Sequence, residues 1–441
     1  MPDKVVLAYS GGLDTSIIIP WLIENHGLEV HCVCGDVGQG DEELAGLEEK
    51  ARRTGARSCK VVDLKRAFLT DCVWPNLRAL SVYEGRYLLG TSMARPILAK
   101  AQVDYAREVG ASALAHGCTG KGNDQVRFEL AYQALAPELS VIAPWREWPI
   151  RSREDALEYA AKRGIPVTAS RAKIYSRDRN LWHISHEGGA LEDPAHAPPD
   201  DVWMLTASPE KAPDRAQVLT LGYEAGVPVS VDGERLAPED LVATLNKVSG
   251  RHGVGRVDIV ENRLVGMKSR GVYETPGGTA ILEGLRTLRA LTMERDTLRG
   301  CERLMPDYAD LVYTGRWFAP LREALDAFFV KATETVTGEV RVRLFKGQAT
   351  ALSATSPFSL YSEDLATFGE GGPSAGFDHA DSAGFVKLYG LPNMVAASVR
   401  RKRGFQPASN PRDSVPSPNT PARKSTPTAK KPVVSPRGKS R

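Results

Sequence analysis

Cysteine is scarce in this sequence, and no two cysteines form a C-x-x-C pair. So few thiols do not make a disulfide scaffold in a chain of 441 residues. Cys32 and Cys34 would point to one face of a strand without an accompanying histidine pair, which indicates a buried face and no metal site. We expect reduced, mostly buried thiols at Cys32, Cys34, Cys59, Cys72, Cys118 and Cys301.

Long apolar runs are also missing, since no stretch approaches the roughly 18 uninterrupted apolar residues of a membrane helix. Met1-Pro2-Asp3-Lys4 leads directly into a strand-like segment, without the apolar core of a signal peptide. We therefore expect no membrane contact and a cytoplasmic location. The composition, 42% hydrophobic and 25% charged, is typical of a globular protein, and the length predicts two or three domains.

Acidic side chains are nearly absent from one end of the chain. Residues 400–441 hold twelve Lys or Arg and a single acid, whereas the other 399 residues hold 45 basic and 53 acidic side chains. From residue 403 to 441 the chain is rich in Pro, Ser, Thr, Lys and Arg, so we expect a disordered basic tail. Contact with nucleic acid, phosphorylation at Ser417-Pro418 or Ser435-Pro436, or no defined role all stay open.

The first third of the chain alternates short β-branched runs with segments of helical periodicity. This pattern predicts an α/β fold, with a doubly wound parallel-sheet nucleotide-binding domain over residues 1–168. The expected strands are 4–9, 29–34, 59–63, 113–116 and 141–143, and the expected helices are 15–25, 42–54, 94–109, 124–134 and 154–163.

The remainder mixes hairpin and helix patterns. It predicts an α+β synthetase or multimerisation domain over residues 169–367 and a linker with a C-terminal arm over 368–402. Asp232-Gly233 is a hairpin turn signal, and a second hairpin is expected within 338–353. Helical periodicity covers 238–248, 279–291 and 320–335.

Two common nucleotide motifs are missing as well. The spacing G-x-x-x-x-G-K-[ST] does not occur, because Gly120-Lys121 is followed by Gly122. No G-x-G-x-x-G follows the first strand. Kinase-type phosphoryl transfer and NAD chemistry are therefore not expected.

The first strand is instead followed by the segment 10–16, SGGLDTS, which leads into a helix. Two glycines let the backbone turn tightly, and the helix N-terminus adds free N–H groups. Ser10, Thr15 and Ser16 add hydroxyl groups. A helix cap explains one of these residues but not the whole run, so the segment predicts a pyrophosphate-binding loop without lysine.

This loop resembles the S-G-G-x-D-[ST] signature of the N-type ATP pyrophosphatases, which adenylate a carbonyl-like oxygen and release pyrophosphate. From about Lys4 to Leu388, further blocks in the same order resemble the argininosuccinate synthase family. The blocks are 8–16 (AYSGGLDTS), 38–40 (GQG), 83–92 (YEGRYLLGTS), 116–129 (HGCTGKGNDQVRFE) and 266–278 (GMKSRGVYETPGG). The basic tail lies outside the resemblance.

The resemblance implies a carbon–nitrogen ligase of arginine biosynthesis. The ureido oxygen of citrulline would attack the α-phosphate of ATP, bound with Mg²⁺, to give citrullyl-AMP and pyrophosphate. The aspartate amine would then displace AMP to give argininosuccinate. Such chemistry depends on positioning and on oriented charge, so no catalytic residue is assigned. The resemblance also implies a homotetramer in which the C-terminal arm reaches neighbouring subunits.

The resemblance also implies three sets of binding residues. For ATP they are Ala8, Tyr9, Ser10, Gly11, Gly12, Leu13, Asp14, Thr15, Ser16, Gly35 and Gly117. For citrulline they are Tyr87, Ser92, Asn123, Arg127, Ser176, Ser185, Glu261 and Tyr273. For aspartate they are Thr119, Asn123 and Asp124, with Asp124 accepting from the ammonium group.

Some of these residues have a chemical rationale and some have a structural alternative. The Arg127 guanidinium suits a carboxylate, and Asn123 shares its helix face. Glu261 ends an apolar strand, where burial without a partner is costly, so a ligand or an arginine is expected beside it. His116 is interpreted as structural. Asn123 and Asp124 could instead cap a helix, Ser176 and Ser185 could be loop hydroxyls, and Tyr87 could belong to the core.

Two other functions stay open from the sequence. Another adenylating synthetase could act on a tRNA base or an amide, although the acidic body argues against tRNA. A nucleotide-sensing module without activity is the second alternative. The intact loop and the unbroken block from residue 119 to 127 favour the ligase.

Overall fold

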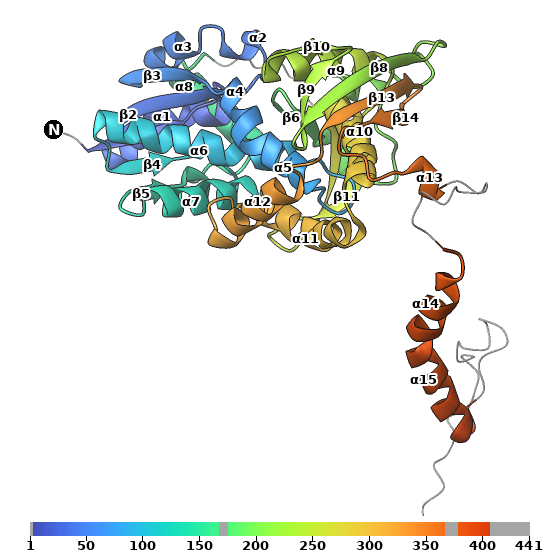
Figure 1. The fold of residues 1–441 in the computed structure, drawn as a ribbon. Helices are drawn as coiled ribbons and strands as arrows, with labels where there is room; N and C mark the ends of the chain where they lie inside the picture. The colour runs from blue at the N-terminus through green and yellow to red at the C-terminus, as the bar shows by residue number, and fades with distance from the viewer. Residues whose placement is uncertain (1–2, 167–174, 367–377, 406–441) are drawn as a thin grey trace, which may run out of the picture. The chain divides into compact units, whose positions relative to one another are not determined.

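The computed structural model of the chain describes residues 3–166, 175–366 and 378–405. Its first sheet has five parallel strands in the order β3, β2, β1, β4, β5 (Figure 1). The strands are β1 (Lys4–Ala8), β2 (Glu29–Asp36), β3 (Ser58–Asp63), β4 (Ala113–Ala115) and β5 (Ser140–Ile142). The five predicted strands are all present, and the α/β fold class is confirmed.

Helices cover both faces of this sheet. Successive side chains of β1 point to opposite sides, and those on each side are apolar and buried. Val5 and Leu7 pack into one apolar core with α1, α3 and α8, whereas Val6 packs into another with α6 and α7. These helices are α1 (Leu13–His26), α2 (Asp41–Leu44), α3 (Leu47–Arg53), α6 (Gly90–Val109), α7 (Asp124–Leu135) and α8 (Arg153–Lys162). The single helix predicted over 42–54 is wrong, because Gly46 takes a left-handed φ of +68° and divides it into α2 and α3.

The strand order reverses between β1 and β4, which are hydrogen-bonded neighbours. The loops after these two strands therefore meet at the carboxyl edge of the sheet, where open α/β sheets bind ligands. These are the two segments that the sequence predicts for nucleotide and amino-acid binding.

The strands in the rest of the described chain form two antiparallel sheets. One has the order β10, β9, β8, β13, β14 and the other the order β11, β12, β7, β6. Their strands are β6 (Ser176–Arg179), β7 (Ile184–Glu187), β8 (Gln217–Glu224), β9 (Val227–Val231), β10 (Glu234–Arg235), β11 (Arg256–Asn262), β12 (Lys268–Glu274), β13 (Gly338–Phe345) and β14 (Gln348–Thr355). Both predicted hairpins are present, and Asp232 and Gly233 take φ values of +50° and +82°, as a type I′ turn requires.

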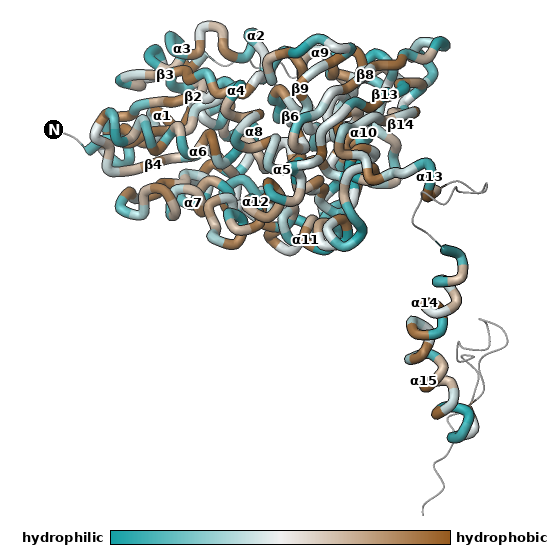
Figure 2. The backbone as a smooth tube through the Cα atoms, viewed as in Figure 1, coloured by the Kyte–Doolittle hydropathy of each residue, from teal (hydrophilic) through white to brown (hydrophobic). Residues whose placement is uncertain are grey.

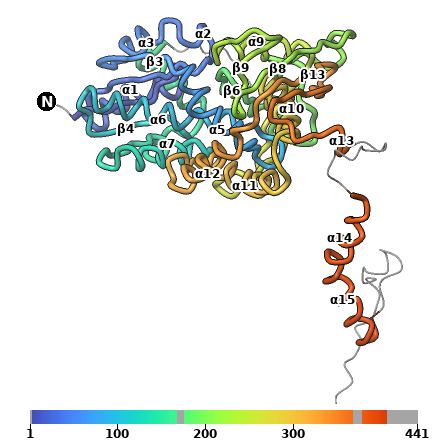
Figure 3. The backbone as a smooth tube through the Cα atoms, viewed as in Figure 1, coloured from blue at the N-terminus to red at the C-terminus, as the bar shows by residue number. Residues whose placement is uncertain are grey.

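The second part also contains four long helices, α9 (Pro238–Arg251), α10 (Pro276–Thr292), α11 (Arg295–Tyr313) and α12 (Pro320–Ala332). Three of them were expected, but α11 was not, because Pro306 inside it is a helix-breaking signal. A helical segment over residues 65–79 was not predicted either. It consists of α4 (Lys65–Ala67), a π-helical stretch (Phe68–Val73) and α5 (Trp74–Ala79). Although α5 and α12 are far apart in the sequence, they pack side by side (Figure 3).

The chain divides into two compact units, Met1–Tyr361 and Ser362–Arg441. The described helices of the second unit are α13 (Glu363–Ala366), α14 (Asp381–Tyr389) and α15 (Leu391–Lys402). Apolar residues along α14 and α15 alternate with polar ones and are exposed (Figure 2). The predicted boundary at residue 168, the linker at 368–377 and the tail beyond residue 405 lie outside the described residues.

Candidate functional site

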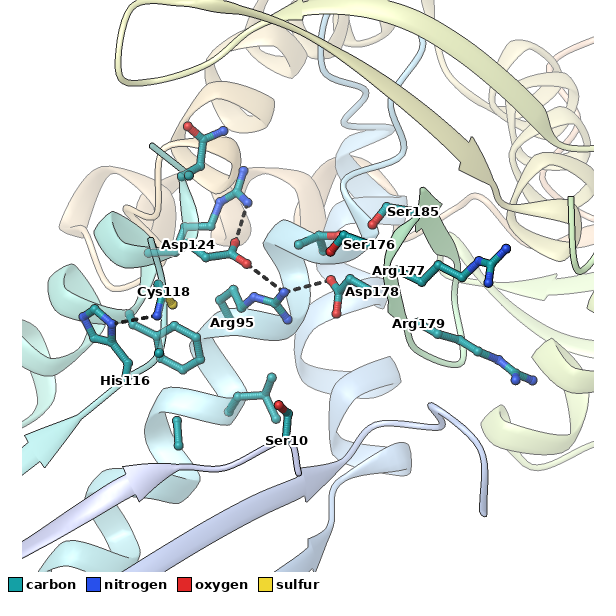
Figure 4. Close-up of a pocket in the computed structure, with 18 of the residues that line it drawn as sticks. Ser10, Arg95, His116, Cys118, Asp124, Ser176, Arg177, Asp178, Arg179 and Ser185 are labelled. Carbon is teal, nitrogen blue, oxygen red and sulfur yellow. Dashed lines mark hydrogen bonds and ion pairs between the residues drawn. The ribbon is translucent and has the colours of Figure 1, made fainter. Parts of the chain in front are cut away.

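A cavity of about 520 Å³ lies where the carboxyl edge of the parallel sheet meets the four-stranded sheet (Figure 4). Most of the residues predicted for substrates line it. They are Ala8, Tyr9, Ser10, Thr15, Gly35 and Gly117 for ATP, Tyr87, Asn123, Arg127, Ser176, Ser185, Glu261 and Tyr273 for citrulline, and Thr119 and Asp124 for aspartate. Predicted residues outside the lining are Gly11, Gly12, Leu13, Asp14, Ser16 and Ser92.

The loop after β1 is shaped by its glycines. Gly11 has φ +71°, and a Cβ there would lie 2.3 Å from Cδ1 of Leu47. The Lys50 ammonium donates to the Gly11 carbonyl at 2.5 Å. Gly12 stands at the N-cap of α1 without a side-chain cap, so the first amides of the helix have no intrahelical acceptor and suit an anion.

Hydroxyl groups flank this helix start. Ser10 Oγ lies 3.2 Å from Thr15 Oγ1 and accepts from the Gly12 amide at 3.4 Å. Gly117, which follows β4, approaches α1 closely, because a Cβ there would lie 3.1 Å from Thr15 Cγ2 and 3.2 Å from Ile18 Cδ1. The loop after β4 therefore lies against the first turns of α1.

The N-terminus of α7 carries three of the predicted amino-acid contacts. Asn123 makes no capping bond; its Oδ1 accepts from the Leu264 amide at 2.9 Å, in the turn between β11 and β12. Arg127 donates through Nη1 to Asp124 Oδ1 at 2.9 Å and through Nε to the Tyr313 carbonyl at 2.9 Å. The capping alternative for Asn123 is therefore wrong.

Asp124 is held between two guanidinium groups. Its Oδ2 accepts from Arg95 Nη2 at 2.8 Å, and the same nitrogen donates to Asp178 Oδ2 at 2.8 Å (Figure 4). Burial opposes ionisation of Asp124, but the charges of Arg95 and Arg127 outweigh it and lower its pKa to about 2. Asp124 is therefore a carboxylate at neutral pH.

Glu261 is buried and bonded to two tyrosine hydroxyls. Tyr273 donates to its Oε2 at 2.8 Å and Tyr313 to its Oε1 at 2.7 Å. Burial raises the pKa of Glu261, and the two hydroxyls partly counteract that rise. The hydrogen-bond partners of Glu261 are thus two tyrosines that the sequence analysis did not name, and the charge of Arg127 also favours its ionised form.

The remaining predicted residues have simpler surroundings. Ser176 and Ser185 lie on the paired strands β6 and β7 at the cavity wall (Figure 4). Ser92 is buried in α6. His116 lies 3.0 Å from Glu129 and accepts from the Cys118 amide at 3.3 Å. It also lines the cavity, so its structural interpretation stays a prediction.

The sequence prediction missed several residues of the cavity wall. They are Gln39, Thr91, Arg95, Arg177, Asp178, Arg179, Glu187 and Arg263. Thr91 lies inside a block that carried the resemblance, and the alternating charges of residues 177–179 beside Ser176 were an available signal. Nothing in the local pattern of α6 indicated Arg95.

A five-stranded parallel sheet whose strand order reverses beside a glycine-rich helix start and a charged cavity is the arrangement of an α/β nucleotide-binding domain. Two family models match the chain, the "Arginosuccinate synthase N-terminal HUP domain" over residues 4–166 and the "Arginosuccinate synthase C-terminal domain" over residues 175–396. The chain belongs to the argininosuccinate synthase family.

Individual relatives agree with this assignment. The chloroplastic argininosuccinate synthase of Arabidopsis thaliana is 56% identical over 90% of this chain and 80% of its own length. Argininosuccinate synthase of Moorella thermoacetica is 57% identical over 92% of this chain and 98% of its own length. That of Desulforamulus reducens is 57% identical over 91% of this chain and all of its own length. The chain is a ligase of this family, whose reaction forms argininosuccinate with AMP and pyrophosphate.

Proposed function

We propose that this chain binds ATP, citrulline and aspartate together in the 520 Å³ cavity and joins the two amino acids through citrullyl-AMP. The observation that carries the proposal is that residues expected for each of the three substrates line one cavity at the topological switch point. The alternatives, a synthetase for tRNA or an amide and an inactive sensor, have no comparable support.

In this proposal the phosphates of ATP bind at the N-terminus of α1, beside the hydroxyls of Ser10 and Thr15, and the adenosine lies near Gly35 and Gly117. Mg²⁺ enters with ATP as part of the substrate. Among residues 3–166, 175–366 and 378–405, no group of three or more His, Cys, Asp or Glu is arranged to hold a metal ion. This fits a Mg²⁺ ligated mainly by phosphate oxygens and water.

Citrulline is proposed to lie between Arg127 and Glu261. Within the described part of the chain, Arg127 Nη2 has no hydrogen-bond acceptor, so it is available to the citrulline carboxylate. The Glu261 carboxylate would accept from the citrulline ammonium group. Aspartate is proposed to bind at Thr119, Asn123 and Asp124, whose carboxylate has further lone pairs after accepting from Arg95 and Arg127.

The residues then act by holding the reactants. The ureido oxygen of citrulline attacks the α-phosphorus, and pyrophosphate leaves. The aspartate amine next attacks the activated ureido carbon, and AMP leaves with the former ureido oxygen. Held in line, the reactants gain the entropic advantage of an intramolecular reaction, and the amides of α1 meet the developing phosphate charge.

We also propose a homotetramer and a cytoplasmic location. The exposed apolar side chains of α14 and α15, which include Phe385, Leu388 and Met394, support a contact with another copy of the chain. The cysteines are all free thiols, which fits a reducing compartment. Sedimentation equilibrium of the full chain tests the tetramer, and a monomer at micromolar concentration would contradict it.

The proposed reaction is tested by measuring pyrophosphate and AMP release with MgATP, adding citrulline and aspartate singly and together. We expect AMP release only when both amino acids are present. Release with neither amino acid, or no release with both, would contradict the proposal. Isotope labelling of the ureido oxygen adds a control, since that oxygen should appear in AMP.

A further inference from the structure

Tyr313, the last residue of α11, contacts two proposed citrulline residues at once. Its hydroxyl donates to Glu261 Oε1 at 2.7 Å, and its carbonyl accepts from Arg127 Nε at 2.9 Å. The Arg127 guanidinium also lies over the Tyr313 ring, with Cζ 5.0 Å from the ring centroid. Tyr313 is only 1% exposed. One residue therefore joins α7, a helix that packs on the parallel sheet, to β11 of the four-stranded sheet.

Other tyrosines hold the Tyr313 ring in place. Tyr83 is stacked on it with ring centroids 3.6 Å apart and an interplanar angle of 4°. Tyr87 meets it edge-on at 6.3 Å and is itself stacked on Tyr273 at 4.3 Å. Aromatic pairs of this kind favour one geometry over others. The ring, the hydroxyl and the carbonyl of Tyr313 are therefore all constrained.

The chain turn after α11 presses this arrangement against α7. Gly315 has φ +81°, and a Cβ there would lie 2.7 Å from the Cα of Arg127. Only glycine permits both this backbone conformation and this close approach. The end of α11 is thus packed directly on the helix that carries Arg127.

We propose that Tyr313 is a positioning residue for citrulline, which sets the separation and orientation of Arg127 and Glu261. The inference rests on the proposed function, in which these two groups bind the carboxylate and the ammonium of one amino acid. Tyr313 occupies Arg127 Nε and Glu261 Oε1, while Asp124 and Tyr273 bond Arg127 Nη1 and Glu261 Oε2. Arg127 Nη2 and the further lone pairs of the carboxylate are left for citrulline. It does not contact the reacting atoms.

The hydroxyl has a second effect on Glu261. Charged or titratable groups face this carboxyl from several elements. They are Tyr313 on α11, Tyr273 on β12, Arg127 on α7, Glu187 on β7, Arg263 in the turn after β11, and Tyr83 and Tyr87 in the segment before α6. A hydrogen bond to a carboxylate favours its ionised form. Loss of the Tyr313 hydroxyl should therefore raise the pKa of Glu261 and weaken citrulline binding first at acid pH.

The test is Tyr313→Phe in the full chain, with Tyr308→Phe as the matched control. Tyr308 is also buried on α11, but its hydroxyl donates to Asp326, which does not line the cavity. We expect Tyr313→Phe to raise KM for citrulline about tenfold, the effect of one lost bond to a charged group. KM for ATP and kcat should change less than about twofold, and Tyr308→Phe should leave all three unchanged.

A double-mutant cycle with Glu261→Gln separates positioning from general stability. If Tyr313 acts through Glu261, Tyr313→Phe should raise KM for citrulline clearly less in the Glu261→Gln background than it does in the wild-type background. Direct citrulline binding by calorimetry gives the same comparison if turnover is too slow to follow. Equal rises in KM for ATP and citrulline, or no rise at all, would overturn the role of Tyr313. Wild-type product formation tests the proposed function separately.

Discussion

Arg95 Nη2 lies 2.8 Å from Asp124 and 2.8 Å from Asp178, so one guanidinium joins two carboxylates. Asp124 begins α7 beside the parallel sheet, and Asp178 lies on β6 of the four-stranded sheet. The Arg95 side chain is 12% exposed. This ion triad therefore connects the nucleotide-binding part of the chain to the cavity wall opposite.

Removing that guanidinium should destabilise the fold. Arg95→Met keeps the apolar stem and leaves two carboxylates without their shared cation, so we expect a loss of about 3 kcal/mol in the free energy of unfolding. Urea denaturation at pH 7 measures it. Lys100→Met on the same helix is the control, because Lys100 and Asp104 are both more than half exposed, and it should cost under about 1 kcal/mol. Equal losses would contradict the importance of the triad.

Stability should also fall in acid because of Asp124. Its pKa is lowered in the folded chain from 3.8 to about 2, so its contribution is present above pH 3.8 and is lost as the pH falls through about 2. The shift corresponds to about 2 kcal/mol. We expect the stability difference between the wild type and Asp124→Asn to shrink by that amount between pH 5 and pH 2. Unfolding curves over this range measure it, and a constant difference would refute the assignment.

Gly11 should matter more for ATP than for folding. Gly11→Ala and Gly110→Ala both place alanine at a left-handed φ, +71° and +66°, and each should cost about 1 kcal/mol of stability. A Cβ at Gly110 meets no atom within 4 Å, whereas one at Gly11 collides with Leu47. We therefore expect KM for ATP to rise roughly tenfold only in Gly11→Ala. A similar rise in Gly110→Ala would indicate a general effect of destabilisation.

Arg127→Ala should raise KM for citrulline much more than KM for ATP. Loss of the guanidinium removes the proposed carboxylate contact, so we expect KM for citrulline to rise about a hundredfold while KM for ATP changes little. Arg127→Lys keeps the charge without the planar fork, so its KM for citrulline should lie between those of the wild type and Arg127→Ala. Steady-state kinetics with each substrate varied in turn measures this, and equal effects on both substrates would exclude the proposed contact.

The basic tail should be dispensable for turnover. The family model ends at residue 396, and matches over about 91% of this chain cover the full length of some relatives. No residue beyond 403 is among the proposed contacts. We expect a chain ending at residue 405 to keep wild-type kcat and KM values, and a loss of activity on truncation would give the tail a direct role.

The sheet, and the glycine-rich loop that follows its first strand, could be predicted because their signals are local. Alternating β-branched and helical segments indicate a parallel sheet, and the run from Ser10 to Ser16 indicates its loop. The helix α11 was missed because Pro306 contradicts a helical reading, although tertiary packing tolerates it. Tyr313 was missed along with that helix.

By itself, the sequence determined the class of fold, the position of the glycine-rich loop after the first strand and, through its blocks, the family. Those features depend on residues that are near neighbours in the chain. Only the tertiary structure decided which polar groups meet. Arg95 pairs with Asp178 of β6, Asn123 accepts from the turn after β11, and Arg127 donates to the end of α11. A buried charge needs a partner brought to it by the whole fold, and neither local propensity nor periodicity specifies which residue that is.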